Sequence, residues 1–289
     1  MVYILMNPLA NNHKGEEATE QAKKLFDAAT VKIVDVRHLT DVPVFISRLS
    51  TEDKIVVAGG DGTVARFIDA VYDLKISQQV FLYPCGSGND FWHDIRENYP
   101  ADTKLYPLND YMKDLPEVVV NGVYRRFING VGFGIDGYCC EQGDIHREKS
   151  KKAINYTKIA IKGILYDYKR ANATVTVDGE TKSYKNVILA PCMMGRYYGG
   201  GIMVAPMQDR MNKERVVTSV VWRGSRLGTL LRISSAFKGK HVKYKKNIDV
   251  RQGHSVKVVF EKPCALQIDG ETFRNVSSYS VTFHNHDNK

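Results

Sequence analysis

Residues 54–63, with the sequence KIVVAGGDGT, constrain the fold more than any other stretch of the chain. Four consecutive apolar residues before a glycine pair predict a short buried strand that ends abruptly in a loop. The glycines Gly59, Gly60 and Gly62 permit left-handed backbone angles and leave main-chain N–H groups open to a phosphate. Asp61 lies among them, where it would repel phosphates unless it held a divalent cation or accepted a proton. The stretch predicts either a phosphate-binding loop or a tight turn formed by Asp and Gly.

Strand and helix patterns alternate around this stretch. Runs of apolar residues predict strands at 2–6, 31–36, 55–58 and 80–83. Helical spacing of apolar residues falls at 16–29, 42–49 and 64–72. Alternating strands and helices imply an α/β fold with a parallel sheet, whose ligands bind at the carboxyl ends of the strands. The glycine loop lies at such an end.

Two more loops follow predicted strands. Residues 7–15 lead into a helix, and Lys14 can neutralise a phosphate there or remain an ordinary surface lysine. Residues 84–90, PCGSGND, supply Ser87 and two flexible glycines. Asn89 or Asp90 can also cap a helix that begins near residue 91.

The second half of the chain has a different pattern. Prolines at 100, 107 and 116 interrupt regular elements, and short strand patterns dominate afterwards. We therefore expect one domain over residues 1–115 and another over 116–289. Asn-Gly at 121–122 and Asp-Gly at 178–179 indicate hairpin turns. The second domain should be an antiparallel β-sandwich or open barrel.

Two stretches suggest a surface for partners. Residues 149–168 have the spacing of one amphipathic helix, which would pack on the core or lie on a membrane. Residues 222–262 carry eleven Lys and Arg against two acids, which indicates an anionic phospholipid surface, a nucleic acid or a solvated basic face. Few aromatic residues are interleaved with these charges, so we expect no nucleic acid to bind.

Composition fits a protein outside the membrane. The 289 residues are 43% hydrophobic and 25% charged, and no apolar run reaches the length of a membrane span. We expect a cytoplasmic protein that can associate peripherally with membranes. Five scattered cysteines give no disulfide framework and no zinc-binding spacing.

The order of the motifs resembles that of one family. GGDGT, PCGSGND, the glycine-rich segment at 195–201 and Asp269-Gly270-Glu271 are similar to motifs of the diacylglycerol kinase catalytic-domain family, which includes bacterial lipid kinases and sphingosine-kinase-like enzymes. The resemblance covers nearly the whole chain. It implies a Rossmann-like ATP-binding domain, a mainly antiparallel β-sandwich domain for the lipid, and transfer of the γ-phosphoryl group of ATP to a lipid alcohol such as diacylglycerol.

The resemblance also implies roles for residues. Glu271 would be the general base, with Asp61 as the second candidate, and Asp61, Asp90 and Asp136 would surround Mg²⁺. Asp136, beside Gly137, can equally be a turn former. The residues expected at the nucleotide are Asn7, Lys14, Gly59, Gly60, Gly62, Thr63, Gly86, Ser87, Gly88 and Asn89.

The chain departs from the family pattern at several places, three of which bear on the nucleotide and metal sites. Ala10-Asn11 replaces a Ser-Gly pair, Ala65-Arg66 replaces Asn-Glu, and Lys213 stands in a loop that holds a structural divalent ion in relatives. Two alternatives therefore stay open, an NAD kinase-like enzyme that shares GGDGT and a non-catalytic nucleotide or lipid binder. A homodimer is also possible.

Overall fold

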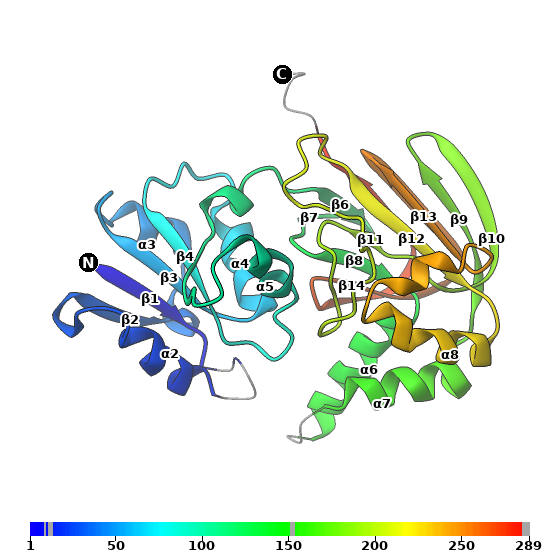
Figure 1. The fold of residues 1–289 in the computed structure, drawn as a ribbon, viewed down its shortest axis with the longest axis horizontal. Helices are drawn as coiled ribbons and strands as arrows, with labels where there is room; N and C mark the ends of the chain where they lie inside the picture. Colours follow the sequence, from blue (N-terminus) through cyan, green and yellow to red (C-terminus); the bar gives the residue numbers. More distant parts are fainter. Residues whose placement is uncertain (9, 11–13, 151–153, 285–289) are drawn as a thin grey trace. The chain divides into compact units, whose positions relative to one another are not determined.

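The structure is a computed structural model that describes residues 1–8, 10, 14–150 and 154–284. The chain divides into two compact units, Met1–Lys113 and Asp114–Lys289, whose elements are labelled in Figure 1. Each unit is described by itself. Within the described residues, no helix is both long enough and apolar enough to span a bilayer.

The first unit is a five-stranded sheet with the order β2-β1-β3-β4-β5. The first four strands are parallel, and β5 runs antiparallel to β4. The strands are β1 (Val2–Met6), β2 (Val31–Asp35), β3 (Lys54–Gly59), β4 (Gln79–Pro84) and β5 (Tyr106–Pro107). The α-helices are α2 (Gly15–Lys23), α3 (Val42–Ser47), α4 (Asp61–Val71) and α5 (Asp90–Ile95). Short 3-10 turns are η1 (Ala28–Thr30), η2 (Val36–His38), η3 (Arg96–Asn98) and η4 (Asn109–Met112). The predicted parallel α/β fold is confirmed.

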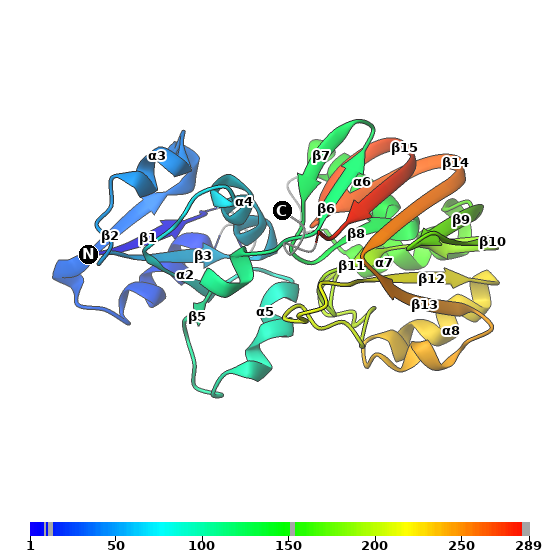
Figure 2. The same ribbon diagram turned by 90° about the horizontal axis from the view of Figure 1, so that it is seen from above.

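Strand β3 lies at the centre of this sheet, which explains its continuous apolar run. Val56 and Ala58 pack with Ala22 of α2 on one face. Ile55 and Val57 point to the opposite face, because successive side chains of a strand alternate. Figure 2 shows α2 and α3 on opposite sides of the sheet. Helices therefore cover both faces of β3.

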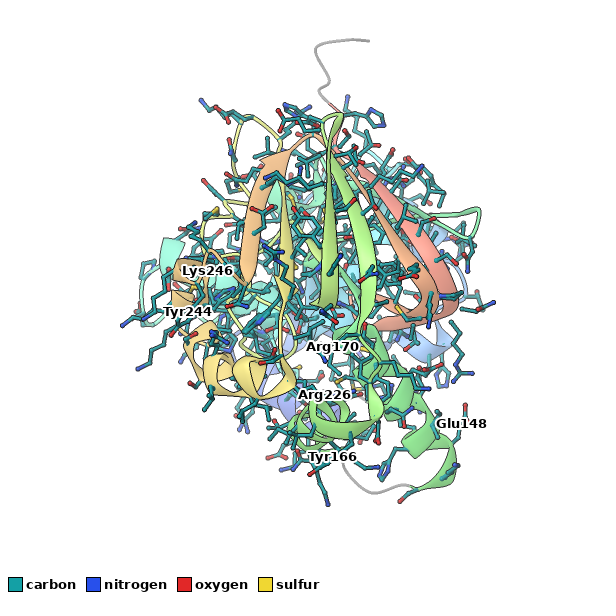
Figure 3. The ribbon with its side chains drawn as sticks, turned by 90° about the vertical axis from the view of Figure 1, so that its right-hand side faces the viewer. Glu148, Tyr166, Arg170, Arg226, Tyr244 and Lys246 are labelled. Atoms are coloured by element: carbon teal, nitrogen blue, oxygen red, sulfur yellow. The ribbon has the colours of Figure 1, made fainter. Side chains whose placement is uncertain are left out.

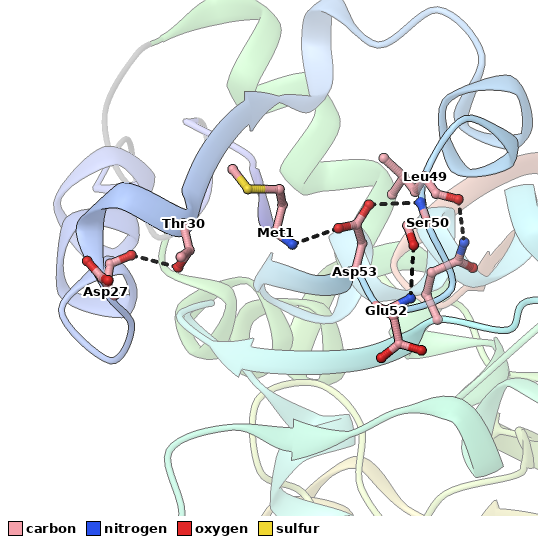
Figure 4. Close-up of polar contacts among 8 residues, drawn as sticks. Met1, Asp27, Thr30, Leu49, Ser50, Glu52 and Asp53 are labelled. Carbon is pink, nitrogen blue, oxygen red and sulfur yellow. Dashed lines mark hydrogen bonds and ion pairs between the residues drawn. The ribbon is translucent and has the colours of Figure 1, made fainter.

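The start of β1 is tied to the turn before β3 (Figure 4). The amino group of Met1 lies 2.7 Å from Oδ1 of Asp53, and Oδ2 accepts the N–H of Ser50 at 2.8 Å. The hydrogen bond from the amino group is the main reason that the pKa of Asp53 lies below its ordinary value. The contact links the start of β1 to the turn before β3, next to the paired residues Val2 and Lys54.

The second unit is built from antiparallel strands. They are β6 (Glu117–Val120), β7 (Val123–Arg126), β8 (Gly130–Phe133), β9 (Ala171–Val177), β10 (Glu180–Leu189), β11 (Cys192–Met193), β12 (Val217–Arg223), β13 (Ile248–Gly253), β14 (Ser255–Ile268) and β15 (Glu271–Thr282). The long strand β14 pairs with β9 through its first half and with β8 through its last three residues. The pairings β14-β8-β11-β12-β10-β9 therefore close back on β14. The expectation of an antiparallel β-rich domain is confirmed.

Both expected hairpin turns are present, and Asp269-Gly270 forms a third of the same kind. Asn121-Gly122, Asp178-Gly179 and Asp269-Gly270 each join consecutive strands with two residues of positive φ. This backbone matches the twist of antiparallel strands, and only Gly, Asn and Asp adopt it readily.

The helices of the second unit correct one prediction. They are α6 (Ile135–Lys149), α7 (Tyr156–Lys162) with the π-helical turn η5 (Gly163–Asp167), and α8 (Arg226–Ala236) with the 3-10 turn η6 (Lys240–Lys243). The single helix expected over 149–168 is wrong, because α6 ends where it should begin. Ser150 is extended, and the side chain of Asn155 caps a new helix by accepting the N–H of Lys158 at 2.9 Å. Residues 151–153 of that prediction lie outside the described residues.

Candidate active site

The GGDGT segment forms the junction between β3 and α4. The strand ends at Gly59, Gly60 precedes the helix, and Asp61 is its first residue. The expected left-handed angles are absent from Gly59, Gly60 and Gly62. Close approach explains two of these glycines instead. A Cβ on Gly60 would lie 2.7 Å from Cα of Gly86, and one on Gly59 would lie 2.4 Å from Cβ of Thr63. A Cβ on Gly62 would meet no atom within 4 Å.

The loop after β4 is closed by Asn89. Its Oδ1 accepts the N–H of Gly86 at 2.8 Å, and its Nδ2 donates to the carbonyl of Gly86 at 2.9 Å. Asn89 has a φ of 53°, a left-handed conformation that asparagine tolerates. Ser87 at the tip is exposed, and Gly88 is half-buried. The side chain of Asn89 does not cap α5, contrary to one of the two readings of the sequence.

Asp61 caps α5 instead. Its Oδ1 accepts the N–H of Phe91 at 2.7 Å, and its Oδ2 accepts the N–H of Asp90 at 3.0 Å. A carboxylate at a helix N-terminus satisfies unpaired N–H groups and interacts favourably with the helix dipole. Asp61 therefore connects the first residue of α4 with the first turn of α5. Asp90 itself is buried.

The loop after β1 meets α4 through a side-chain contact. Nδ2 of Asn7 donates to Oγ1 of Thr63 at 2.9 Å. Gly15, the first residue of α2, allows the helix to approach that loop, since a Cβ there would lie 2.0 Å from the carbonyl oxygen of Asn7. Lys14 is exposed just before α2. Ala10 is described and donates its N–H to the carbonyl of Asn7, whereas Asn11 lies outside the described residues.

The three loops thus gather at the carboxyl ends of β1, β3 and β4. The N-terminus of α4, an 11-residue helix, lies at the same edge of the sheet, directly after β3. Helix N-termini present N–H groups and a partial positive charge to anions. Such an arrangement can hold a polyphosphate close to the main chain.

Asp136 belongs to the second unit and is not a turn residue. It lies in the first turn of α6, where its Oδ1 accepts the N–H of Gly137 at 3.0 Å. Its Oδ2 is buried, and the side chain of Tyr198 interacts with the carboxylate and opposes the effect of burial on its pKa. Burial raises the pKa of Asp136 to about 6, although backbone hydrogen bonds oppose the rise. Gly132 gives this carboxylate room, since a Cβ there would lie 2.0 Å from Oδ2.

The two acidic residues of the late Asp-Gly-Glu motif have different surroundings. Asp269 accepts the N–H groups of Ile128, Asn129 and Gly130 at 2.6, 2.9 and 3.0 Å. It therefore anchors the segment that enters β8. Glu271 begins β15 and is exposed. The anchoring role of Asp269 was missed, because its partners at 128–130 lie about 140 residues away in the sequence.

Arg210 is a second residue that the sequence did not single out. Its guanidinium donates to the carbonyl of Ile128 at 2.7 Å and to Oδ1 of Asn129 at 3.1 Å. Asp269 and Arg210 together fix both the N–H and the C=O groups of one segment. No local pattern reveals such contacts, since the partners lie more than 80 residues apart.

The glycine-rich segment at 195–201 forms a tight turn. Gly199, Gly200 and Gly201 all have positive φ, and Tyr198 and Ile202 exchange backbone hydrogen bonds around them. The guanidinium of Arg196 lies 5.5 Å from the ring centre of Tyr197. These angles require glycine here.

The loop around Lys213, where the resemblance implies a structural ion, uses its side-chain oxygens for local hydrogen bonds. Oδ1 of Asp209 accepts the N–H of Met211, and Oδ1 of Asn212 accepts the N–H of Glu214. In the part of the chain that the structure describes, no three His, Cys, Asp or Glu residues are grouped as metal ligands.

The fold places the chain among two-domain proteins that join a parallel α/β unit to an antiparallel β-rich unit. Residues 1–111 match the family "Diacylglycerol kinase catalytic domain", and residues 129–282 match "YegS C-terminal NAD kinase beta sandwich-like domain". The chain belongs to the diacylglycerol kinase catalytic-domain family of lipid kinases.

Individual relatives are distant in sequence. A protein named diacylglycerol kinase from Mycobacterium tuberculosis is 23% identical over 256 residues, which cover 83% of this chain and 79% of the relative. The crystal structure of a diacylglycerol kinase from Bacillus anthracis str. Sterne aligns with a TM-score of 0.63 at 19% identity and covers 99% of this chain and 97% of its own. The structural likeness supports the fold.

Proposed function

We propose that the protein is an ATP-dependent lipid kinase that transfers the γ-phosphoryl group to the hydroxyl of a lipid alcohol. Diacylglycerol is the first acceptor to test, since the M. tuberculosis relative is named diacylglycerol kinase. The observation that carries the proposal is the contact between the GGDGT loop and the loop after β4. Gly60 and Gly86 approach so closely that neither has room for a Cβ, and α4 begins directly after Gly60. We assign residues 1–115 to ATP and residues 116–289 to the lipid.

Phosphate binding would use groups that the first unit already positions. The N–H groups at the start of α4 point along the helix axis and favour negative charge. The side chain of Asn7 is hydrogen-bonded to that of Thr63 in the first turn of α4, and Lys14 supplies a positive charge on the loop after β1. Electrostatic positioning of this kind is the main contribution of a protein to phosphoryl transfer.

The carboxylates present fit a magnesium ion. Mg²⁺ in kinases is held by one or two carboxylates together with phosphate oxygens, so a cluster of three protein ligands is not needed. Asp61 and Asp90 belong to the first unit, where Oδ2 of Asp61 accepts the N–H of Asp90 at 3.0 Å. Asp61 and Asp90 would hold the ion, which would neutralise the developing charge on the phosphate oxygens.

Glu271 is our candidate for the base that accepts the proton of the lipid hydroxyl. It is exposed, and the neighbouring Asp269 holds its hairpin on the segment 128–130. Asp61 is the second candidate, but both of its oxygens already accept backbone N–H groups of α5. A base needs an oxygen that reaches the substrate hydroxyl within about 3 Å.

The test is transfer of labelled γ-phosphate from ATP with Mg²⁺ to lipid alcohols in mixed micelles. We would compare the wild type with Glu271→Gln and with Glu261→Gln, a matched change at an exposed position in β14. We expect labelled lipid from the wild type and Glu261→Gln, and a loss on the order of a hundredfold or more in kcat for Glu271→Gln with ATP binding retained. Full activity of Glu271→Gln would remove this residue from the role.

The same assay separates the alternatives. Label transferred to NAD and to no lipid would assign the protein to the NAD kinase-like class. ATP binding without transfer to any acceptor would indicate a non-catalytic binder.

A further inference from the structure

Helix α8 exposes apolar side chains on the face that points away from its core. Leu227 and Leu231, one turn apart, are 66% and 73% exposed, and Phe237 just after the helix is 51% exposed. The opposite face of α8 packs on the core, since Ala236 belongs to a core cluster that also contains Trp222. Single exposed apolar residues are ordinary, but three along one helix need a reason.

A second segment presents apolar residues in the same way. Ile161 in α7 is 42% exposed, and Tyr166 in η5 is 72% exposed. With Leu165 they line a shallow groove along the helix, together with the stems of Lys158 and Lys162. The segment is not an isolated amphipathic helix, because Ile164 and Tyr168 pack into the same core cluster as α8.

Arg226 joins the two segments rigidly. From the first turn of α8 it donates to the carbonyl oxygens of Ile164 and Tyr168 at 2.6 and 2.9 Å. Arg170 adds a hydrogen bond to the carbonyl of Gly224, just before α8. Figure 3 shows Arg226 between α8 and the turns that carry Tyr166. We call the residues Ile161, Tyr166, Leu227, Leu231 and Phe237 the α7–α8 surface.

Positive charges surround this surface. Exposed lysines on α7, on η6 and in the adjoining loops are Lys158, Lys162, Lys169, Lys238, Lys240, Lys243, Lys245 and Lys246. Residues 226–246 contain no Asp or Glu. Asp167 is the one acid in residues 156–169, and it pairs with Lys162 at 3.0 Å. Tyr244 and Lys246 lie beside α8 in Figure 3.

We propose that the α7–α8 surface docks the protein on an anionic lipid bilayer. Apolar side chains would enter the boundary between headgroups and acyl chains, and the lysines would contact anionic headgroups. A second copy of the chain is a poorer occupant, because a two-fold interface would place the same lysines against each other. The proposal rests on the proposed function in one respect, since a kinase for lipid alcohols must reach its substrate in a membrane.

The first test is co-sedimentation of the full chain with phosphatidylcholine vesicles that contain or lack 30% phosphatidylglycerol. The variant is Leu227→Gln/Leu231→Gln, which keeps good helix formers at exposed positions. The matched control is Leu25→Gln/Leu74→Gln, at leucines that are 43% and 39% exposed in the first unit. We expect the wild type and the control to bind vesicles with phosphatidylglycerol, and the variant to bind on the order of tenfold or more weakly.

A charge variant tests the second half of the proposal. Lys245→Glu/Lys246→Glu should weaken binding on the order of tenfold or more, and mainly to vesicles with phosphatidylglycerol. Lys75→Glu/Lys104→Glu makes the same charge change at exposed positions in the first unit and should have little effect. Equal vesicle binding by the wild type and both surface variants would overturn the proposal. A wild-type dimer that Leu227→Gln/Leu231→Gln turns into a monomer, with vesicle binding unchanged, would assign the surface to self-association instead.

Activity on a dissolved substrate separates this proposal from the function it rests on. Phosphoryl transfer to a short-chain diacylglycerol below its critical micelle concentration needs no docking. The Leu227→Gln/Leu231→Gln variant should keep that activity while it loses vesicle binding. Wild-type vesicle binding without any transfer would overturn the kinase proposal alone, and wild-type transfer without vesicle binding would overturn the docking proposal alone.

Discussion

Gly60 and Gly62 are two residues apart, yet their surroundings differ. Gly60→Ala would place a Cβ 2.7 Å from the backbone of Gly86, so the two loops must separate. We expect the free energy of unfolding to fall by about 1–3 kcal/mol, as in other overpacked sites. Gly62→Ala meets open space in the first turn of α4 and should change stability by less than about 1 kcal/mol in either direction.

Urea unfolding of both variants measures the difference, and ATP binding adds a second readout. Loss of ATP binding by Gly62→Ala without loss of stability would indicate that the phosphates approach the main chain there. A Gly60→Ala variant as stable as the wild type would contradict the close contact.

Asp136 should make stability depend on pH in an unusual direction. Its pKa rises from 3.8 to about 6 on folding, so the buried carboxyl is tolerated while protonated and becomes costly as it ionises. Relative to Asp136→Asn, the wild type should lose about 3 kcal/mol of stability as pH rises from about 4 to above 6.

Thermal or urea unfolding of both proteins in EDTA, from pH 4 to pH 8, checks this difference. Added Mg²⁺ should reduce the loss if Asp136 is a ligand of the ion. A stability difference that is constant across this pH range would show that folding does not raise the pKa of Asp136.

At the residue scale, the sequence predicted several residues of the site but not all of the contacts that these residues make. Gly60, Asn7 and Thr63 were identified from the loops and resemblance, and the structure brings Asn7 and Thr63 together. The reason for Gly60 differed, because a contact with Gly86, 26 residues away, cannot be read from local spacing. The capping of α5 by Asp61 was missed for the same reason.

Between elements, Asp61 links α4 to α5, and its removal should weaken the first unit. Asp61→Ala leaves the N–H groups of Asp90 and Phe91 without this acceptor, which should cost about 1–2 kcal/mol. Asp69→Ala, at an exposed position in the body of α4, is the matched control and should change stability by less than about 0.5 kcal/mol. Urea denaturation of the two variants gives the comparison.

The outcome bears on how kinase assays are designed. If Asp61→Ala unfolds the first unit at assay temperature, its inactivity would say nothing about chemistry. Glu271→Gln avoids this problem because Glu271 is exposed. Equal stability of Asp61→Ala and the wild type would show that the cap contributes little, and Asp61 could then be tested directly.

Some elements could be predicted from the sequence and others could not. The parallel strands have continuous apolar runs, because helices cover both faces, and these were found. Helix α6 was missed because Gly137 and Gly143 weaken its pattern, although Gly137 is required beside the carbonyl of Ala265. Helix α8 was missed because Leu227 and Leu231 place apolar residues on its outer face. Apolar residues on the exposed face of a helix are expected where that surface has a function besides folding.

For the whole molecule, the strongest inference concerns the independence of its units. Among the described residues, one core cluster contains residues of the first unit from Val2 to Leu105, and two others contain residues of the second unit between Val118 and Phe283. A unit with its own core can fold alone. The circuit of strand pairings in the second unit is also complete within residues 114–289.

We therefore expect a fragment of residues 114–289 to fold without the first unit. It should show a near-ultraviolet circular dichroism spectrum of packed aromatic side chains and one cooperative urea transition, because Trp222 and Tyr279 are buried within its own cores. A fragment with native-like secondary structure but no near-ultraviolet signal would be a molten globule and would contradict independence. A folded fragment should also retain the vesicle binding assigned to the α7–α8 surface, since the residues of that surface and their arginine links all belong to it.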